Sequence, residues 1–215
     1  QGPQHSQSLQ AWFAHIPGLK VVMPATPHDA KGLLISSVRD NNPVIFIEHR
    51  WLHGISGPVP EAAYTVPLGS SHVAREGKDV TIVCTSYMVL EGLRAADMLA
   101  EEGIAAEVID VRTVRPLDVP TILSSVRKTG RLLVADTAWV TGGFGAEVVA
   151  QVVENAMPNL KCAPRRLGLM DSPTPTSAAL AGQYYPRAVK LLMVARDMLG
   201  RSTVRVDELQ EQPNP

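Results

Sequence analysis

The chain has 215 residues, of which 45% are hydrophobic and 19% are charged, and its formal net charge is -1. These values are typical of a soluble globular protein with one large or two small domains, and they exclude extended disorder. The balanced charge gives no support for a nucleic-acid or anionic-lipid partner, and no apolar run is long enough to cross a bilayer. Two cysteines, Cys84 and Cys162, are too few for a disulfide framework, which favours a reducing compartment.

The first fifty residues alternate between helical and extended patterns. A helix is expected over 8–16, with Leu9, Trp12, Phe13 and Ile16 on its apolar face. The next expected elements are a strand at 19–23, a helix from 26 that ends before 40, and a strand at 44–47. This alternation with short connections predicts α/β packing.

A stretch rich in glycine and proline separates this part from a second unit. We interpret 54–69 as a linker between one unit at 1–53 and another at 70–203. In the second unit we expect strands at 79–84, 106–110, 131–135 and 165–169, and helices at 88–102, 119–128, 145–156 and 187–199. That order predicts a mostly parallel sheet, and we expect 204–215, which has no apolar period, to be a disordered tail.

Two segments of the first unit carry residues suited to chemistry. His5 lies in a polar stretch just before a helix, where an imidazole could transfer a proton, although the residues alone favour a loop histidine without a role. Carbonyls around Ser37 and Val38, with oxygens of Asp40 and Asn42, could bind a weakly hydrated cation. A helix C-cap with an Asx turn is the interpretation that the local pattern favours.

The second unit offers two segments at strand ends. The glycine-rich run 141–147 precedes a helix like a phosphate loop, but Val148 replaces the last glycine, so helix packing or a subunit contact is favoured. Arginines of 110–118 could bind a carboxylate or a phosphate, but pairing with Asp110 and Asp118 is favoured. A polar and aromatic cluster, either a site wall or a subunit interface, contains His49, Arg50, Trp51 and His53. The residues alone thus indicate two α/β units and leave the function open.

A series of short motifs nevertheless resembles one family along the whole chain, in the same order. They are His5-Ser6-Gln7-Ser8, Ala11-Trp12-Phe13-Ala14-His15, Pro17-Gly18-Leu19-Lys20-Val21-Val22, Asp29-Ala30-Lys31-Gly32-Leu33-Leu34, Arg39-Asp40-Asn41-Asn42-Pro43-Val44, Glu107-Val108-Ile109-Asp110, Arg115-Pro116-Leu117-Asp118 and Gly142-Gly143-Phe144-Gly145-Ala146-Glu147. Together they resemble the transketolase-like β subunits of thiamine-diphosphate-dependent 2-oxo acid dehydrogenases, of the pyruvate or branched-chain type.

The resemblance implies a fold, a reaction and partners. The fold would be a partial pyrimidine-binding domain followed by a transketolase C-terminal-like domain. The chain would be an oxidoreductase subunit that supports decarboxylation of a 2-oxo acid on thiamine diphosphate and acyl transfer to lipoyl. Its partners would be an α subunit, which supplies most diphosphate and Mg²⁺ contacts, a second β subunit in an α2β2 heterotetramer, and a lipoyl acyltransferase core. The expected compartment is the cytoplasm, or the mitochondrial matrix in a eukaryote.

The resemblance also assigns residues and exposes a gap. His5 matches a catalytic histidine thought to help transfer to lipoyl, while Ser37, Val38, Asp40 and Asn42 match a structural potassium site. The chain begins with Gln1, and the family's preceding segment, with the glutamate that activates the cofactor, is missing. We therefore expect a fragment without cofactor-binding residues of its own that is inactive alone. The run 174–177 also departs from the family wording.

Two other interpretations remain open. A transketolase or deoxyxylulose-phosphate synthase would share the fold, and would need further phosphate ligands outside this sequence. A non-catalytic module for dimerisation and docking would need no chemistry at all. The sequence does not specify the 2-oxo acid.

Overall fold

The structure, a computed structural model, describes residues 2–201. The first part contains α1 (Gly2–His5), α2 (Gln10–His15), β1 (Lys20–Val22), α3 (Pro27–Arg39), β2 (Val44–Phe46) and η1 (Arg50–Leu52). Next come β3 (His72–Arg75), β4 (Val80–Cys84), α4 (Met88–Glu101), β5 (Ala106–Asp110), β6 (Thr113–Arg115) and α5 (Val119–Thr129). The last are β7 (Leu132–Trp139), α6 (Phe144–Ala156), η2 (Met157–Asn159), β8 (Arg165–Leu169), α7 (Ala178–Tyr184) and α8 (Ala188–Met198).

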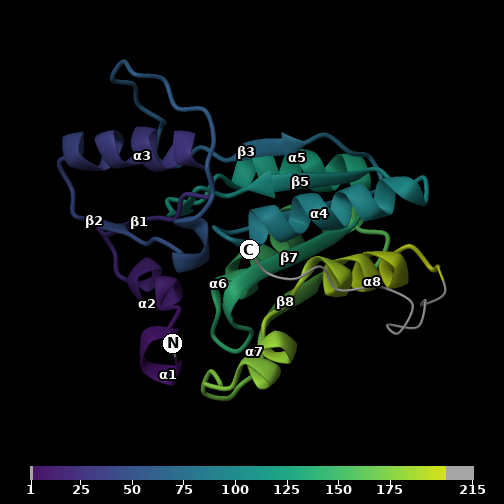
Figure 1. Ribbon diagram of the computed structural model, residues 1–215. Coiled ribbons are helices and arrows are strands. Elements are labelled where there is room, and N and C mark those ends of the chain that lie inside the picture. Colours follow the sequence, from purple (N-terminus) through teal and green to yellow (C-terminus); the bar gives the residue numbers. More distant parts are fainter. Residues whose placement is uncertain (1, 202–215) are drawn as a thin grey trace.

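The strands of the described residues form two sheets that lie beside each other (Figure 1). The smaller sheet has the order β2-β1-β6, and the larger has the order β3-β5-β4-β7-β8. In the larger sheet β4, β5, β7 and β8 run parallel, while β3 pairs antiparallel to β5 at the edge. The expectation of α/β architecture with a mostly parallel second sheet is therefore confirmed.

In the smaller sheet, α3 connects the parallel strands β1 and β2. The helix begins where the sequence predicts, because the Thr26 side chain accepts a hydrogen bond from the Asp29 N–H at 3.1 Å and proline occupies the first turn. Leu33 packs with Val22 and Val66 in a small core. A Cβ at Gly32 would lie 2.5 Å from Val66 Cγ2, so the segment after residue 54 crosses directly over this helix.

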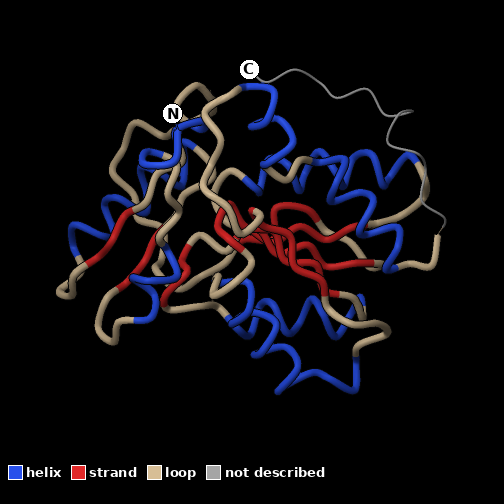
Figure 2. Tube along the Cα trace, turned by 90° about the horizontal axis from the view of Figure 1, so that it is seen from below, coloured by secondary structure: helices blue, strands red, loops and turns tan. Residues whose placement is uncertain are grey.

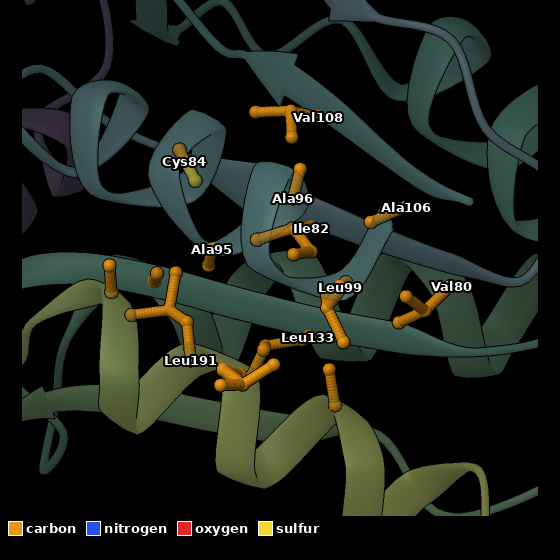
Figure 3. Close-up of a cluster of buried hydrophobic side chains, with 14 of the residues drawn as sticks. Val80, Ile82, Cys84, Ala95, Ala96, Leu99, Ala106, Val108, Leu133 and Leu191 are labelled. Atoms are coloured by element: carbon orange, nitrogen blue, oxygen red, sulfur yellow. The ribbon is translucent and has the colours of Figure 1, made fainter. Parts of the chain in front are cut away.

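Helices cover both faces of the larger sheet (Figure 2). On one face, α4 and α8 build a core that includes Ile82, Leu99 and Leu191 (Figure 3). On the other face, α5 and α6 enclose a second core with Phe144 and Val148. The strand β4 is buried along its whole length, which explains why its sequence is apolar without alternation.

The structure departs from the sequence-based expectations at several elements. The short strand β6 lies within the predicted second unit but pairs antiparallel with β1 of the first sheet. The strand β7 continues to Trp139, and α1, α7 and the edge strand β3 were not expected. These additions are short or partly exposed, so they carry little periodic signal. The predicted tail at 204–215 lies outside the described residues, and none of the described helices is long and apolar enough to span a membrane.

Candidate functional site at the junction of the two sheets

Polar residues gather where the carboxyl ends of β4, β5 and β7 approach the first sheet. Thr85 and Ser86 follow β4, Asp110 ends β5, and Asp136 lies within β7. The Ser86 hydroxyl donates to the Pro24 carbonyl at 3.3 Å, which joins the end of β4 to the end of β1. Ligands bind at such strand ends in open α/β sheets, so this junction is the candidate site.

A buried ion pair joins the two sheets at this junction. Arg112 donates through Nε to Asp29 Oδ2 at 3.0 Å, and its other nitrogen NH2 lies 2.8 Å from Asp29 Oδ1. Arg112 adopts a left-handed backbone with φ of 57°, and its carbonyl accepts from the Met23 N–H at 2.8 Å. The favoured expectation that the arginines of this loop pair with Asp110 and Asp118 was wrong for Arg112. Its partner comes from α3, 83 residues away in the sequence.

Asp110 lies beside this pair, and its pKa is raised above the ordinary value of an aspartate. Its side chain is buried and accepts the Arg112 backbone N–H at 2.9 Å. Burial raises the pKa of Asp110 to about 7, with a further upward contribution from the charge of Asp29, while the Arg112 N–H and guanidinium oppose the shift. Asp110 therefore exchanges its proton near neutral pH.

A second polar contact joins α2 to the larger sheet. Gln10 Nε2 donates to Asp136 Oδ1 at 2.7 Å, and the Thr85 hydroxyl donates to the same oxygen at 2.6 Å. Gln10 is fully buried, whereas Trp12 is 71% exposed and Ile16 46% exposed. The expected apolar face of this helix was thus wrong for Trp12 and Ile16. A six-residue helix follows its tertiary contacts more than its own pattern, so the sequence carried no signal for Gln10.

His5 lies at the last position of the four-residue helix α1, and its side chain is exposed. The chain after it is held locally by the Gln7 side chain, which donates to the Pro3 carbonyl at 3.0 Å. Gly2 lies close to Thr176, since a Cβ at Gly2 would be 3.4 Å from the Thr176 hydroxyl oxygen. His5 is therefore accessible from outside the chain.

The four residues expected to bind a cation lie at the other end of the first unit, across β1 and β2 from α1 (Figure 1). The Asp40 carboxylate forms an ion pair with Lys20 and accepts the Asn42 N–H at 2.8 Å. Lys20 and the Asn42 N–H lower the pKa of Asp40 to about 2. Ser37 Oγ donates to the Leu33 carbonyl at 2.7 Å, and the Val38 side chain points to solvent.

This arrangement is that of a helix C-cap with an Asx turn, in which Lys20 already neutralises the Asp40 carboxylate. The Asp40 carboxylate and the Ser37 hydroxyl already have partners within the chain, so a cation at this position would be bound mainly through backbone carbonyls at the end of α3. Within residues 2–201, no group of three or more His, Cys, Asp or Glu side chains is placed to hold a metal ion. The potassium assignment stays a prediction.

The glycine-rich run at the start of α6 borders a cavity along the junction. Gly142 has φ of 65°, and a Cβ at Gly143 would lie 2.1 Å from the Trp139 carbonyl oxygen, so the turn needs both glycines. The buried Phe144 then packs into the second core, as expected for helix packing. The adjoining cavity of about 510 Å³ is also lined by His15 and Arg115.

The polar and aromatic cluster after β2 packs inside the chain. The His49 ring stacks on Tyr87 at 5.0 Å between centroids, and the Trp51 ring meets Tyr185 at 4.9 Å. The Arg187 guanidinium lies 4.8 Å from the Trp51 centroid. Burial, together with the positive charges of His53 and Arg187, lowers the pKa of His49 to about 4. The cluster thus fixes η1 against the starts of α4 and α8, with His49 neutral at pH 7.

Comparisons with known proteins agree with this two-sheet arrangement. The family model described as the transketolase C-terminal domain matches residues 69–191, and the transketolase pyrimidine-binding domain matches residues 1–54. The chain belongs to the transketolase family. A transketolase-type chain with these two domains was expected from the sequence motifs, and that expectation is confirmed.

Among curated relatives of this transketolase-family chain, two bacterial β subunits are close. The acetoin:2,6-dichlorophenolindophenol oxidoreductase subunit beta of Cupriavidus necator is 48% identical over 90% of this chain and 57% of its own length. The pyruvate dehydrogenase E1 component subunit beta of Bacillus subtilis is 45% identical over 91% of this chain and 60% of its own length. The chain therefore spans a little more than half the length of these relatives.

A solved structure extends the likeness to the fold. A split-gene transketolase, described as an inactive β4 tetramer, matches with a TM-score of 0.75 and 28% sequence identity. The match covers 89% of this chain and 61% of the transketolase chain.

Proposed function

We propose that the chain is the β-subunit portion of a thiamine-diphosphate-dependent 2-oxo acid dehydrogenase. It would act with an α subunit in oxidative decarboxylation of a 2-oxo acid and acyl transfer to lipoyl. The observation that carries this proposal is the paired domain match, pyrimidine-binding at 1–54 and C-terminal at 69–191, together with 45% identity to a pyruvate dehydrogenase β subunit. A second β subunit and a lipoyl acyltransferase core complete the proposed assembly, in the cytoplasm or mitochondrial matrix.

The division of labour follows from the residues that this chain contains. Thiamine diphosphate, when bound, serves as the electron sink for the carbanion that decarboxylation produces. No described residue is assigned to its diphosphate or Mg²⁺, which the α subunit would hold. His5 offers an exposed imidazole, a side chain suited to general acid–base catalysis, which is the role proposed for it during acyl transfer. At the junction, Gln10 donates to Asp136 from the start of α2, five residues after His5.

Association with an α subunit tests the proposal directly. The chain is co-expressed with an α subunit of the pyruvate dehydrogenase type and analysed by size-exclusion chromatography. We expect a complex with α, and no decarboxylation by the chain alone. A stable β dimer that ignores both the α subunit and thiamine diphosphate would support the docking-module interpretation instead. Substantial decarboxylation by the isolated chain would contradict the proposal.

The role of His5 is tested in the reconstituted holoenzyme, with a complete β subunit that carries this sequence. We expect H5Q to slow lipoyl acylation by about 100-fold, the scale of lost general acid–base catalysis. H28Q is the matched control, because His28 is also an exposed helical histidine, and it should leave the rate unchanged. Equal rates for H5Q and wild type would remove His5 from the reaction.

Acetoin is a second candidate substrate, favoured by the 48% identical relative from Cupriavidus necator and a 41% identical relative from Bacillus subtilis with the same printed name. Reduction of 2,6-dichlorophenolindophenol by the reconstituted enzyme is compared with pyruvate, branched-chain 2-oxo acids and acetoin. A rate with acetoin that exceeds those with all the 2-oxo acids would replace the first substrate class with the second.

A further inference from the structure

The Gln10–Asp136 contact contains an imbalance of donors and acceptors. Asp136 Oδ1 accepts from both Gln10 Nε2 and the Thr85 hydroxyl. Asp136 Oδ2 and Gln10 Oε1 are also buried, yet neither has a hydrogen-bond partner among the described residues. Two buried acceptors without donors on residues that already touch each other carry a substantial free-energy cost, about 1–3 kcal/mol each in general.

One proton removes the imbalance. A carboxylic acid has a carbonyl oxygen that accepts and a hydroxyl oxygen that donates, whereas the two oxygens of a carboxylate are equivalent acceptors. Oδ1, with two donors, has the role of the carbonyl oxygen, and Oδ2, with none, has the role of the hydroxyl oxygen. The unpaired Oε1 belongs to the same Gln10 amide that donates to Oδ1. A carboxylic acid and an amide can therefore form two hydrogen bonds, from Nε2 to Oδ1 and from the acid O–H at Oδ2 to Oε1.

A buried water explains the pattern less completely. A cavity of about 10 Å³ is lined by Asp136, Trp139 and Arg166 and is close to the size of one water molecule. A water there could donate to Asp136. Gln10 does not line this cavity, so its Oε1 would remain unpaired.

We propose that Asp136 is a positioning residue for the His5 segment, and that it acts as the neutral carboxylic acid by sharing one proton with the Gln10 amide. Gln10 is the first residue of α2, and His5 lies five residues before it. The helix α2 is short, and its N-cap makes no side-chain hydrogen bond, so it depends on outside contacts for its order. This proposal rests on the proposed function only for the catalytic role of His5.

The electrostatic surroundings favour the protonated form. Burial raises the pKa of Asp136, against the opposing effect of the Thr85 hydroxyl and the Gln10 amide. The nearby backbone N–H groups of Thr137 and Ala138 also oppose the shift, but neither forms a hydrogen bond with Oδ2. Burial raises the pKa of the Cys84 thiol on the adjacent strand β4, so this neighbour stays neutral beside Asp136. Arg166 from β8 lines the same cavity, but its NH1 donates to the Val140 carbonyl at 2.9 Å. His15 on α2 is exposed.

Carbon-13 NMR of the full 215-residue chain, labelled at aspartate side-chain carboxyls, tests the protonation state. The Asp136 signal is assigned by its loss in D136N, and D110N identifies the other aspartate with a raised pKa. We expect the Asp136 signal to keep the chemical shift of the acid at pH 7, where exposed aspartates have the shift of the carboxylate. Titration of Asp136 below pH 5, together with the exposed aspartates, would overturn the proposal and favour a bound water.

Hydrogen exchange tests the positioning role in the same chain, without partner or cofactor. D136N supplies an amide N–H in place of the acid O–H, so we expect wild-type protection of the amides of α2. In D136A and Q10A these amides should exchange at least tenfold faster, with α8 unchanged. Q10A keeps the test valid if D136A fails to fold. Gln10 lies in α2, outside the larger sheet, so its replacement leaves the strands of that sheet intact. Unchanged protection of α2 in Q10A would overturn the proposed role. Both measurements are independent of activity, so their failure is distinguishable from failure of the proposed function.

Discussion

At the scale of single residues, burial shifts the protonation of Asp110 at the junction. Asp110 ends β5 inside the protein, and burial raises its pKa from 3.8 to about 7. The folded state therefore binds this proton more tightly than the unfolded state. The resulting stability is fully present below about pH 4 and is lost as the pH rises through 7.

D110N should remove this pH dependence. The neutral amide keeps an acceptor for the Arg112 N–H and never becomes charged. We expect the wild-type free energy of unfolding to fall by up to about 4 kcal/mol more than that of D110N between pH 4 and pH 8. Urea denaturation at several pH values measures the difference. E154Q, a change at an exposed carboxylate, should follow the wild type, and parallel curves for D110N and wild type would contradict the raised pKa.

At the scale of elements, Asp118 connects the start of α5 to the segment that crosses between the sheets. Its carboxylate accepts the Thr121 N–H at 3.2 Å as the N-cap of the helix. The same side chain accepts the Ser71 N–H at 2.8 Å, just before β3. One side chain thus satisfies a backbone donor in the first turn of α5 and another at Ser71, which lies 47 residues before Asp118.

D118A should lower the free energy of unfolding by about 1–2 kcal/mol, since it removes a helix cap and leaves a second backbone donor unpaired. D118N keeps an acceptor oxygen and should lose less than half as much. Thermal unfolding followed by circular dichroism compares the two variants. Equal losses for D118A and D118N would mean that the negative charge at the helix start, and not the cap, provides the stabilisation.

At the scale of the whole molecule, contacts between residues distant in sequence hold the two sheets together. Among the described residues, the Asp29–Arg112 pair is a largely buried ionic contact between them, and β6 extends the first sheet with a strand from the second part of the chain. Removing one member of a buried pair leaves the other charge without a partner in a poorly solvated place.

R112M should therefore lower the free energy of unfolding by about 3 kcal/mol, near the low end for a broken buried pair. R165M is the matched control: Arg165 pairs with Asp197 at 2.9 Å, but both side chains are about half exposed, and the expected change is under about 1 kcal/mol. Chemical denaturation of R112M and R165M measures these losses. A cycle of wild type, R112M, D29N and the D29N/R112M double variant measures the coupling energy between Asp29 and Arg112. Similar small losses in R112M and R165M would show that the first sheet is held mainly by apolar packing.

The sequence by itself determined most of the larger sheet and its helices. The strands at 80–84, 106–110 and 165–169 and the helices α4, α5, α6 and α8 lie within one or two residues of their expected bounds. Buried strands are read from continuous apolar runs, and helices from a 3.6-residue period with Pro, Asp and Gly at their ends. These signals are local, so they can be recognised in the sequence without knowledge of the fold. The ordered motifs also identified the family.

Only the tertiary structure decided which polar groups meet at the junction. It pairs Arg112 with Asp29 and not with its neighbours, buries Gln10 against Asp136, and exposes Trp12 on the same short helix. It also moves β6 into the first sheet. The two side-chain pairs and the pairing of β6 with β1 each join residues that are more than 80 positions apart in the chain. The exposure of Trp12 follows from the burial of Gln10 on the same helix. No local period encodes such partners, because a polar side chain satisfies its hydrogen bonds with whichever group the fold brings near.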